Sequence, residues 1–139
     1  MLGTAQIGTL TSTEIQAFTT TQANALTSTQ FRGLTTTAIG NFSTTQITAL
    51  SATQAQSLTT TQLNAVSSDV LGAIDLTKLS STQLKGLTTT ALGSFSTTQI
   101  GTLSTTQVQS LTTAQLNAVS SSVLNAIAMA KLSSTQLTG

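Results

Sequence analysis

Apolar side chains recur along this chain with a period of eight residues. The chain divides into blocks of eight over residues 3–74 and 80–127, with a truncated block from residue 133. Position five of every block is apolar, and position eight of every complete block is Leu, Phe, Val or Ile. Position one is Ser or Thr in every block but the first, and position four is most often Gln. Each block, hereafter an octad, is therefore a copy of one pattern, of which residues 43–50 (STTQITAL) are typical.

Ser or Thr followed three residues later by Gln or Glu is the signature of a capping box at the start of a helix. The hydroxyl accepts a hydrogen bond from the amide three residues on, and the Gln or Glu side chain accepts one from the first residue's amide. The apolar residues just before the cap and at position five, such as Leu58 and Leu63, can then form a hydrophobic staple. The pattern predicts a capped helix of one to two turns in each octad.

The predicted caps are the hydroxyls at position one and the amides at position four. The hydroxyls are Thr11, Thr19, Thr27, Thr35, Ser43, Ser51, Thr59, Ser80, Thr88, Ser96, Ser104 and Thr112, and the amides are Gln22, Gln30, Gln46, Gln54, Gln62, Gln83, Gln99, Gln107 and Gln115. Glu14 is the one acidic residue at position four, a replacement that the capping box permits. Position four is apolar at Ala38, Val70, Ala91 and Val123.

A β-solenoid is the alternative, because Thr, Ile and Val favour strands. A strand needs alternation, however, and Ile47 and Ala49 would share one face while Leu50 falls on the other. The array also lacks the Gly, Asn and Asp punctuation that solenoid corners usually need. Disorder fits poorly with so regular an apolar pattern. We therefore predict an all-α solenoid of very short helices.

The octads form a single array over residues 1–139. Nine octads occupy residues 3–74, six occupy residues 80–127, and residues 133–139 begin the next copy. Five-residue inserts, at residues 75–79 and 128–132, interrupt the array. The two inserts define a longer period, because residues 31–83 and 84–136 align at a spacing of 53 with 39 identities.

The octad just before each insert lacks Gln, and apolar residues continue through the second insert at nearly helical spacing without Gly or Pro from Ser122 to Leu132. This predicts one longer helix in each 53-residue repeat, with Lys78 and Lys131 in its last turn, where a cation suits the helix dipole. Six octads plus an insert also predict a superhelical turn of six or seven short sides.

A single octad is too short to hold its own helix, because isolated helices below about 12 residues are marginal in water. Stability must therefore come from neighbouring units that stack, as in other solenoids. Positions five and eight would form a continuous apolar core, including all four Phe residues, and Ser, Thr and Gln would cover the outside.

Charge is too sparse to indicate a charged partner. The chain has four Lys and Arg and three Asp and Glu, with a net charge of +1. It therefore lacks the basic surface that nucleic acid or anionic lipid requires. No apolar run approaches the roughly 18 residues of a transmembrane helix. There is no Cys, which excludes a small disulfide scaffold.

Catalysis, cofactors and metals are not indicated either. With no His and no Cys, the usual general base and the strongest nucleophile are absent. The three carboxylates, Glu14, Asp69 and Asp75, are too few for a metal site, and Ser122 and Ala128 replace the two Asp in the second copy. We expect surface or capping roles for them.

Regular rows of Thr leave a second class of function open, a ligand-binding repeat that orders water on ice or binds a surface glycan. Exposed hydroxyls are also candidates for O-glycosylation. Only positions two and three are free for these roles, because capping occupies position one. Without Trp or Tyr, an aromatic platform for sugars or bases is not expected.

The run from Phe42 to Leu50, repeated from Phe95 to Leu103, resembles the Ser/Thr/Gln-rich tandem repeats of very large bacterial surface or secreted proteins, some of them adhesin-like. The resemblance implies a structural role outside the cell, as a stalk, spacer, adhesive segment or self-assembling fibre. Self-association, end to end or lateral, also fits a polar surface with little charge to repel its copies.

The chain begins directly in the repeat, since Met1-Leu2-Gly3 carries no charged or apolar leader. Three expectations follow, namely a piece of a longer protein, export by a signal elsewhere, or retention inside the cell. Cell-surface components are further possible partners under the resemblance.

Overall fold

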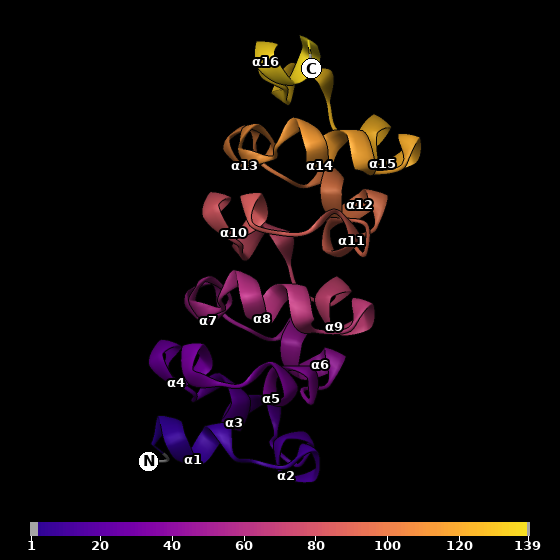
Figure 1. Ribbon diagram of the computed structural model, residues 1–139. Coiled ribbons are helices and arrows are strands. Elements are labelled where there is room, and N and C mark those ends of the chain that lie inside the picture. Colours follow the sequence, from indigo (N-terminus) through magenta and orange to yellow (C-terminus); the bar gives the residue numbers. More distant parts are fainter. Residues whose placement is uncertain (1–2, 139) are drawn as a thin grey trace.

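In the computed structural model, which describes residues 3–138 apart from the Thr4 side chain, the chain is a solenoid of very short helices (Figure 1). No strand forms within these residues, so the all-α prediction is confirmed and the β-solenoid alternative is wrong. The elements are α1 (Thr4–Gly8), α2 (Ser12–Gln16), α3 (Thr20–Asn24), α4 (Ser28–Gly33), α5 (Thr36–Gly40), α6 (Thr44–Thr48), α7 (Ala52–Ser57), α8 (Thr60–Ala65), α9 (Ser68–Gly72), the 3₁₀ helix η1 (Leu76–Lys78), α10 (Ser81–Lys85), α11 (Thr89–Leu92), α12 (Thr97–Gly101), α13 (Thr105–Ser110), α14 (Thr113–Ala118), α15 (Ser121–Ala126), the 3₁₀ helix η2 (Met129–Lys131) and α16 (Ser134–Thr138).

One octad gives one helix because its two ends are extended. Position one precedes the helix in an extended conformation, as at Thr59 (φ −78°, ψ 156°), and its side chain caps the first turn. The chain is extended again at position eight, as at Leu58 (φ −63°, ψ 135°). Two extended residues between consecutive helices make a corner, which turns the chain without a glycine in the left-handed region among the described residues.

Three helices complete one turn of the solenoid. α4 packs on α1, α7 on α4, and α15 on α12, so each of these helices lies on the third element before it. In Figure 1, α1, α4 and α7 follow one another up the left side, each in its own layer. The predicted turn of six or seven sides is therefore wrong, and the seven sides of the 53-residue repeat span a little more than two turns.

The predicted longer helix at each insert is also wrong. α15 ends at Ala126, Ile127 and Ala128 are extended, and a separate 3₁₀ helix follows. η1 packs on α7 and η2 on α13, so each insert behaves as one additional short side. The physical reason is burial, because Ile127 is 3 % exposed and the chain must bend there to keep position eight in the core.

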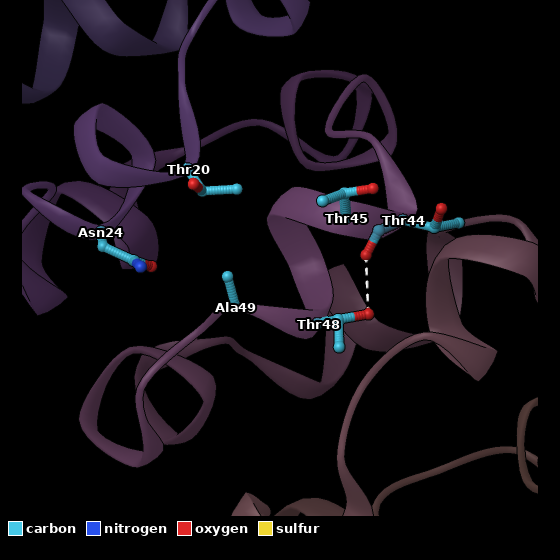
Figure 2. A pocket seen from close by; sticks show the side chains of 6 residues that line it. All are labelled: Thr20, Asn24, Thr44, Thr45, Thr48 and Ala49. Carbon is cyan, nitrogen blue, oxygen red and sulfur yellow. Dashed lines mark hydrogen bonds between the residues drawn. The ribbon is translucent and has the colours of Figure 1, made fainter.

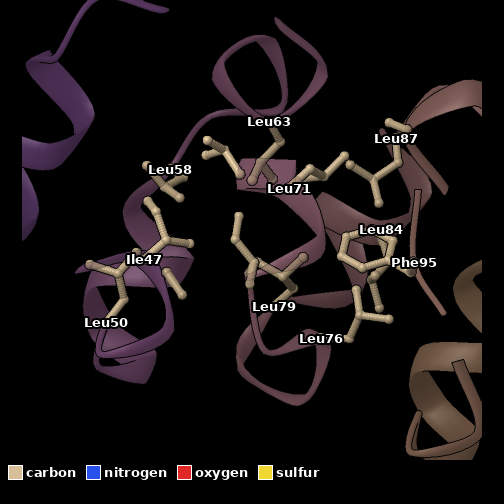
Figure 3. Packing of buried hydrophobic residues seen from close by; sticks show 14 of the residues in the cluster. Ile47, Leu50, Leu58, Leu63, Leu71, Leu76, Leu79, Leu84, Leu87 and Phe95 are labelled. Carbon is tan, nitrogen blue, oxygen red and sulfur yellow. The ribbon is translucent and has the colours of Figure 1, made fainter. Parts of the chain in front are cut away.

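Positions five and eight line a continuous core along the axis (Figure 3). Leu63, Leu71 and Leu84 from position five are at most 2 % exposed, and they meet position-eight residues such as Leu58 and Leu87. Phe31 and Phe42 contact each other with ring centroids 5.7 Å apart. Since each octad supplies only two large core side chains, a helix is stable only between the turns above and below it.

Candidate functional site

The first candidate site is the corner at which each helix begins. At Ser43 the hydroxyl accepts a hydrogen bond from the Gln46 amide (3.2 Å), and Gln46 Oε1 accepts one from the Ser43 amide (2.8 Å). The same pair of bonds is made by Thr11 with Glu14, Thr19 with Gln22, Thr27 with Gln30, Ser51 with Gln54, Thr59 with Gln62, Ser80 with Gln83, Ser96 with Gln99, Ser104 with Gln107, Thr112 with Gln115 and Ser133 with Gln136.

Thr35 and Thr88 make only half of this arrangement. Their hydroxyls accept from the amides of Ala38 and Ala91 at 3.1 Å, but alanine has no side-chain oxygen to return the bond. At Thr88 the missing acceptor comes from the turn below. Asn64 Oδ1 accepts from the Thr88 amide (2.9 Å), and Asn64 Nδ2 donates to the Gly86 carbonyl (2.9 Å).

The position-four glutamines have a second role, which capping does not explain. The Nε2 of Gln62 donates to the carbonyl oxygens of Phe31 (3.0 Å) and Leu34 (2.7 Å), which belong to positions five and eight of the fourth octad before it. Both acceptors lie at the corner of the turn below, where the end of a helix leaves carbonyls without partners in the helix. One amide group thus caps its own helix through its oxygen and, through its nitrogen, donates hydrogen bonds to carbonyl groups at the end of a helix in the turn below.

Between described residues, eight glutamines make this bond to the turn below, and we call them the corner glutamines. They are Gln46, Gln54, Gln62, Gln83, Gln99, Gln107, Gln115 and Gln136. Six of the eight are less than 9 % exposed, although amides are usually found at the surface. Their burial is tolerated because both ends of the amide are paired, and no buried side-chain nitrogen or oxygen among the described residues lacks a partner.

Lysine does the same work at the inserts. The Lys78 ammonium donates to the Leu50 carbonyl (2.7 Å), and the Lys131 ammonium donates to the carbonyls of Gly101 (3.2 Å) and Leu103 (2.7 Å). Leu50 and Leu103 are position-eight residues, four elements earlier when the 3₁₀ helix is counted. The two lysines therefore replace the corner glutamine, and their role is not limited to the helix dipole.

Electrostatics contributes little elsewhere. Lys78 and Asp75 approach to 4.0 Å with both side chains partly exposed, a geometry worth little in water. Asp75 accepts from the Thr77 amide and so caps η1. At Glu14, hydrogen bonds from the backbone amide and the hydroxyl of Thr11 lower the pKa of the carboxyl below its ordinary value of 4.5.

Shallow grooves run between successive turns. One of about 410 Å³ lies between α3 and α6, lined by Thr20, Asn24 and Thr44 together with Thr45, Thr48 and Ala49 (Figure 2). Thr48 Oγ1 donates to the Thr44 carbonyl of its own helix (2.8 Å). A groove of this kind offers hydroxyls and amides but no general base, and the described residues contain no cluster of three His, Cys, Asp or Glu.

Every predicted cap therefore lies at a corner, but the bonds of the corner glutamines to the turn below were missed. A signal for them exists in the sequence. A capping box accepts Glu as readily as Gln, yet position four is Gln in eleven octads and Glu in one. That preference indicates a use for the amide's N–H groups.

Comparison with known proteins identifies a repeat family over part of the chain. Residues 1–36 match the family model of the ALTTAQ repeat, which is 36 of 139 residues. Read as amino acids, these six letters correspond to positions seven to four across one corner, as in residues 25–30 (ALTSTQ). No curated protein and no solved structure matches the chain. Across the described residues, no helix is long and apolar enough to cross a membrane.

Proposed function

We propose that this chain is a non-enzymatic structural region of a large bacterial surface or secreted protein, which acts as a stiff stalk or spacer. One observation carries the proposal. Consecutive turns are joined at their corners by the corner glutamines and lysines and along the axis by one core, so extra copies lengthen the rod without changing its contacts. A flexible linker would have neither feature.

The surface fits this role. It is rich in Ser, Thr and Gln, it carries few charges, and the groove between α3 and α6 is lined by neutral groups. Adhesive contact or assembly into fibres would use this surface or the ends of the rod. An enzyme would need groups that the chain lacks, because His and Cys are absent and its three carboxylates lie apart in the sequence.

Small-angle X-ray scattering tests the rod directly. The wild type is compared with a variant in which residues 84–136 are duplicated in tandem, so that one further 53-residue repeat is added. The maximum dimension should rise by the length of seven further sides, a little more than two turns, while the cross-section stays constant. A constant maximum dimension, or a profile typical of a random coil, would contradict a stalk.

The location is tested separately in cells that express the complete natural protein. Antibodies against residues 84–136 should label intact cells, and external protease should remove the label. Labelling that requires permeabilised cells would place the region inside and reject the extracellular proposal.

A neutral glycan ligand is a second candidate, favoured by the concave groove between α3 and α6. Its hydroxyl and amide groups suit a sugar better than ice, which requires a flat face, and Asn24 interrupts the threonines. Binding on a glycan array that is lost in Thr44→Val and unaffected in Thr105→Val would support it. Thermal hysteresis of the isolated chain would favour ice instead.

A further inference from the structure

One residue of every octad, at position three, is exposed to solvent. All sixteen position-three residues, from Ala5 to Thr135, are exposed, and twelve of them are Thr. No position-three hydroxyl makes a hydrogen bond to a described residue. Figure 2 shows the case of α6, where Thr48 donates to the Thr44 carbonyl while the Thr45 hydroxyl, at position three, makes no bond. Capping and packing therefore do not explain these threonines.

The hydroxyls at the neighbouring positions are occupied or shielded. Those at position one cap the helices, and those at position seven donate to their own helix, as Ser57 Oγ does to the Gln54 carbonyl (2.6 Å). Several position-two side chains lie against the next turn. Thr60, for example, is half-buried and leaves no room for a Cβ at Gly86. Position three is thus the position at which every hydroxyl is both exposed and unbonded.

Position six provides a comparison within the same chain. It is also exposed in most octads, yet it holds Gly, Gln, Asn, Thr, Arg or Lys. Copying of the repeat alone would leave the two exposed positions equally varied. Thr is a poorer helix residue than Ala, which is found at position three only in Ala5 and Ala114. The recurrence of Thr at position three therefore indicates a use for its hydroxyl.

The surface also lacks the charge that favours solubility. Only 5 % of the residues are charged and the net charge is +1, whereas a surface with about 25–35 % charged residues resists association. A net charge near zero promotes association and precipitation. An attached sugar is bulky and solubilising, so sugars on exposed hydroxyls would hydrate the rod without adding charge.

We propose that the position-three threonines are acceptors for O-linked sugars, which a separate glycosyltransferase attaches from a nucleotide-activated sugar. The Thr Oγ1 attacks the anomeric carbon and forms the new C–O bond. The bond from that carbon to the phosphate oxygen breaks, the nucleoside diphosphate leaves, and the hydroxyl proton passes to a base of the transferase. A sugar at position three displaces no hydrogen bond of the fold, whereas one at position one would remove a cap.

The inference goes beyond the proposed stalk, because it concerns the covalent chemistry of the surface. Failure of the two is distinguishable. A rod that carries no sugar still lengthens by whole repeats in scattering, and a chain that carries sugars without forming a rod still shows the added mass.

Mass spectrometry of the complete natural protein, purified from the cells that express it, tests the inference. Its mass should exceed that of the bare sequence by whole sugar residues. Electron-transfer fragmentation should locate these sugars on position-three threonines such as Thr98 and Thr106. The same protein made by cell-free translation provides the unmodified mass.

Three variants of the protein, expressed in the same cells, locate the acceptor. Thr106→Ala should lose one sugar from α13, and Ala114→Thr should gain one on α14, because Ala114 is exposed at the same octad position. Thr105→Ala is the matched control, because it removes an exposed hydroxyl one residue earlier, and it should keep the wild-type number of sugars. Circular dichroism establishes that the variants share one fold.

The proposal is overturned if the natural protein has the mass of the bare sequence, or if its sugars lie on position one or position two. It is also overturned if Thr106→Ala and Ala114→Thr carry as many sugars as the wild type.

Discussion

At the scale of single residues, the amide at position four holds the molecule together in two directions. In Gln62 the oxygen accepts from the Thr59 amide (2.7 Å) while the nitrogen donates to Leu34 (2.7 Å) in the turn below. A carboxylate could provide only the first bond and an ammonium only the second. Glu14 makes the first bond and Lys78 the second, and at the first insert Asp75 caps η1 in place of the amide oxygen.

Lys78 provides the first prediction. Lys78→Met removes the donor to the Leu50 carbonyl, and we expect the free energy of unfolding to fall by about 1.5–3 kcal/mol, the range for hydrogen bonds to charged groups. Chemical denaturation measures this difference. Lys85→Met is the control, because Lys85 is exposed and donates to no described residue, and it should stay within about 0.5 kcal/mol of wild type. Equal losses in both variants would contradict the role of Lys78.

Glu14 provides a prediction of pH dependence. Its pKa is lower in the folded chain than its ordinary value of 4.5, so its contribution to stability is present above that value. The contribution disappears as the pH falls through the folded-state pKa, where the carboxyl takes up a proton. The stability of wild type relative to Glu14→Gln, measured by urea denaturation, should therefore be lower at pH 3 than at pH 7. A difference that is constant across this range would contradict the shift.

At the scale of elements, the sequence was sufficient for the helices and insufficient for how they pack. The octad pattern predicts each helix and its cap, because those depend on residues three or four apart. The longer helix predicted at the insert does not form, because burial of Ile127 ends the helix although Val123 to Leu132 has helical spacing and no breaker. Local spacing does not predict the turn size either, because it depends on contacts that lie 25 to 31 residues apart.

Loss of a single cap should weaken one helix and its corner. Ser43→Ala removes the acceptor for the Gln46 amide, and we expect a loss of about 1 kcal/mol. Thr44→Ala, one residue later, removes a side chain whose hydroxyl makes no hydrogen bond to a described residue, so its loss should be smaller. Thermal denaturation of the pair decides the matter, and equal effects would count against capping.

Glycines at the helix ends report how closely the turns approach. A Cβ at Gly86 would lie 3.2 Å from Thr60 Cβ and closer still to its Cγ2, whereas one at Gly40 would meet nothing within 4 Å. Gly86→Ala should therefore destabilise the chain by about 1–3 kcal/mol, as overpacked sites do. Gly40→Ala should stabilise it by about 0.5–1 kcal/mol, because alanine favours helix. The opposite order in denaturation experiments would show that Thr60 does not approach Gly86 this closely.

At the scale of the whole molecule, stiffness follows from repetition of one corner. Each turn is bonded to the turn below through polar groups that are buried and paired, and an unpaired buried group would be costly. The apolar core attracts neighbouring turns to one another but does not fix their register. The hydrogen bonds donated by the corner glutamines fix the register, because each one selects particular carbonyl groups of the turn below. A rod of this kind can be extended by whole repeats, which is the property that the proposed stalk requires.

The most direct measurement is urea denaturation of Gln62→Glu beside Gln22→Glu. Both variants keep the capping oxygen, but Gln62 donates to Phe31 and Leu34 from a buried position, while Gln22 is exposed and donates to no described residue. The account predicts a loss of about 3 kcal/mol or more in Gln62→Glu and a change within about 0.5 kcal/mol in Gln22→Glu. Equal effects at the two positions would contradict the claim that the corner amides bind each turn to the turn below.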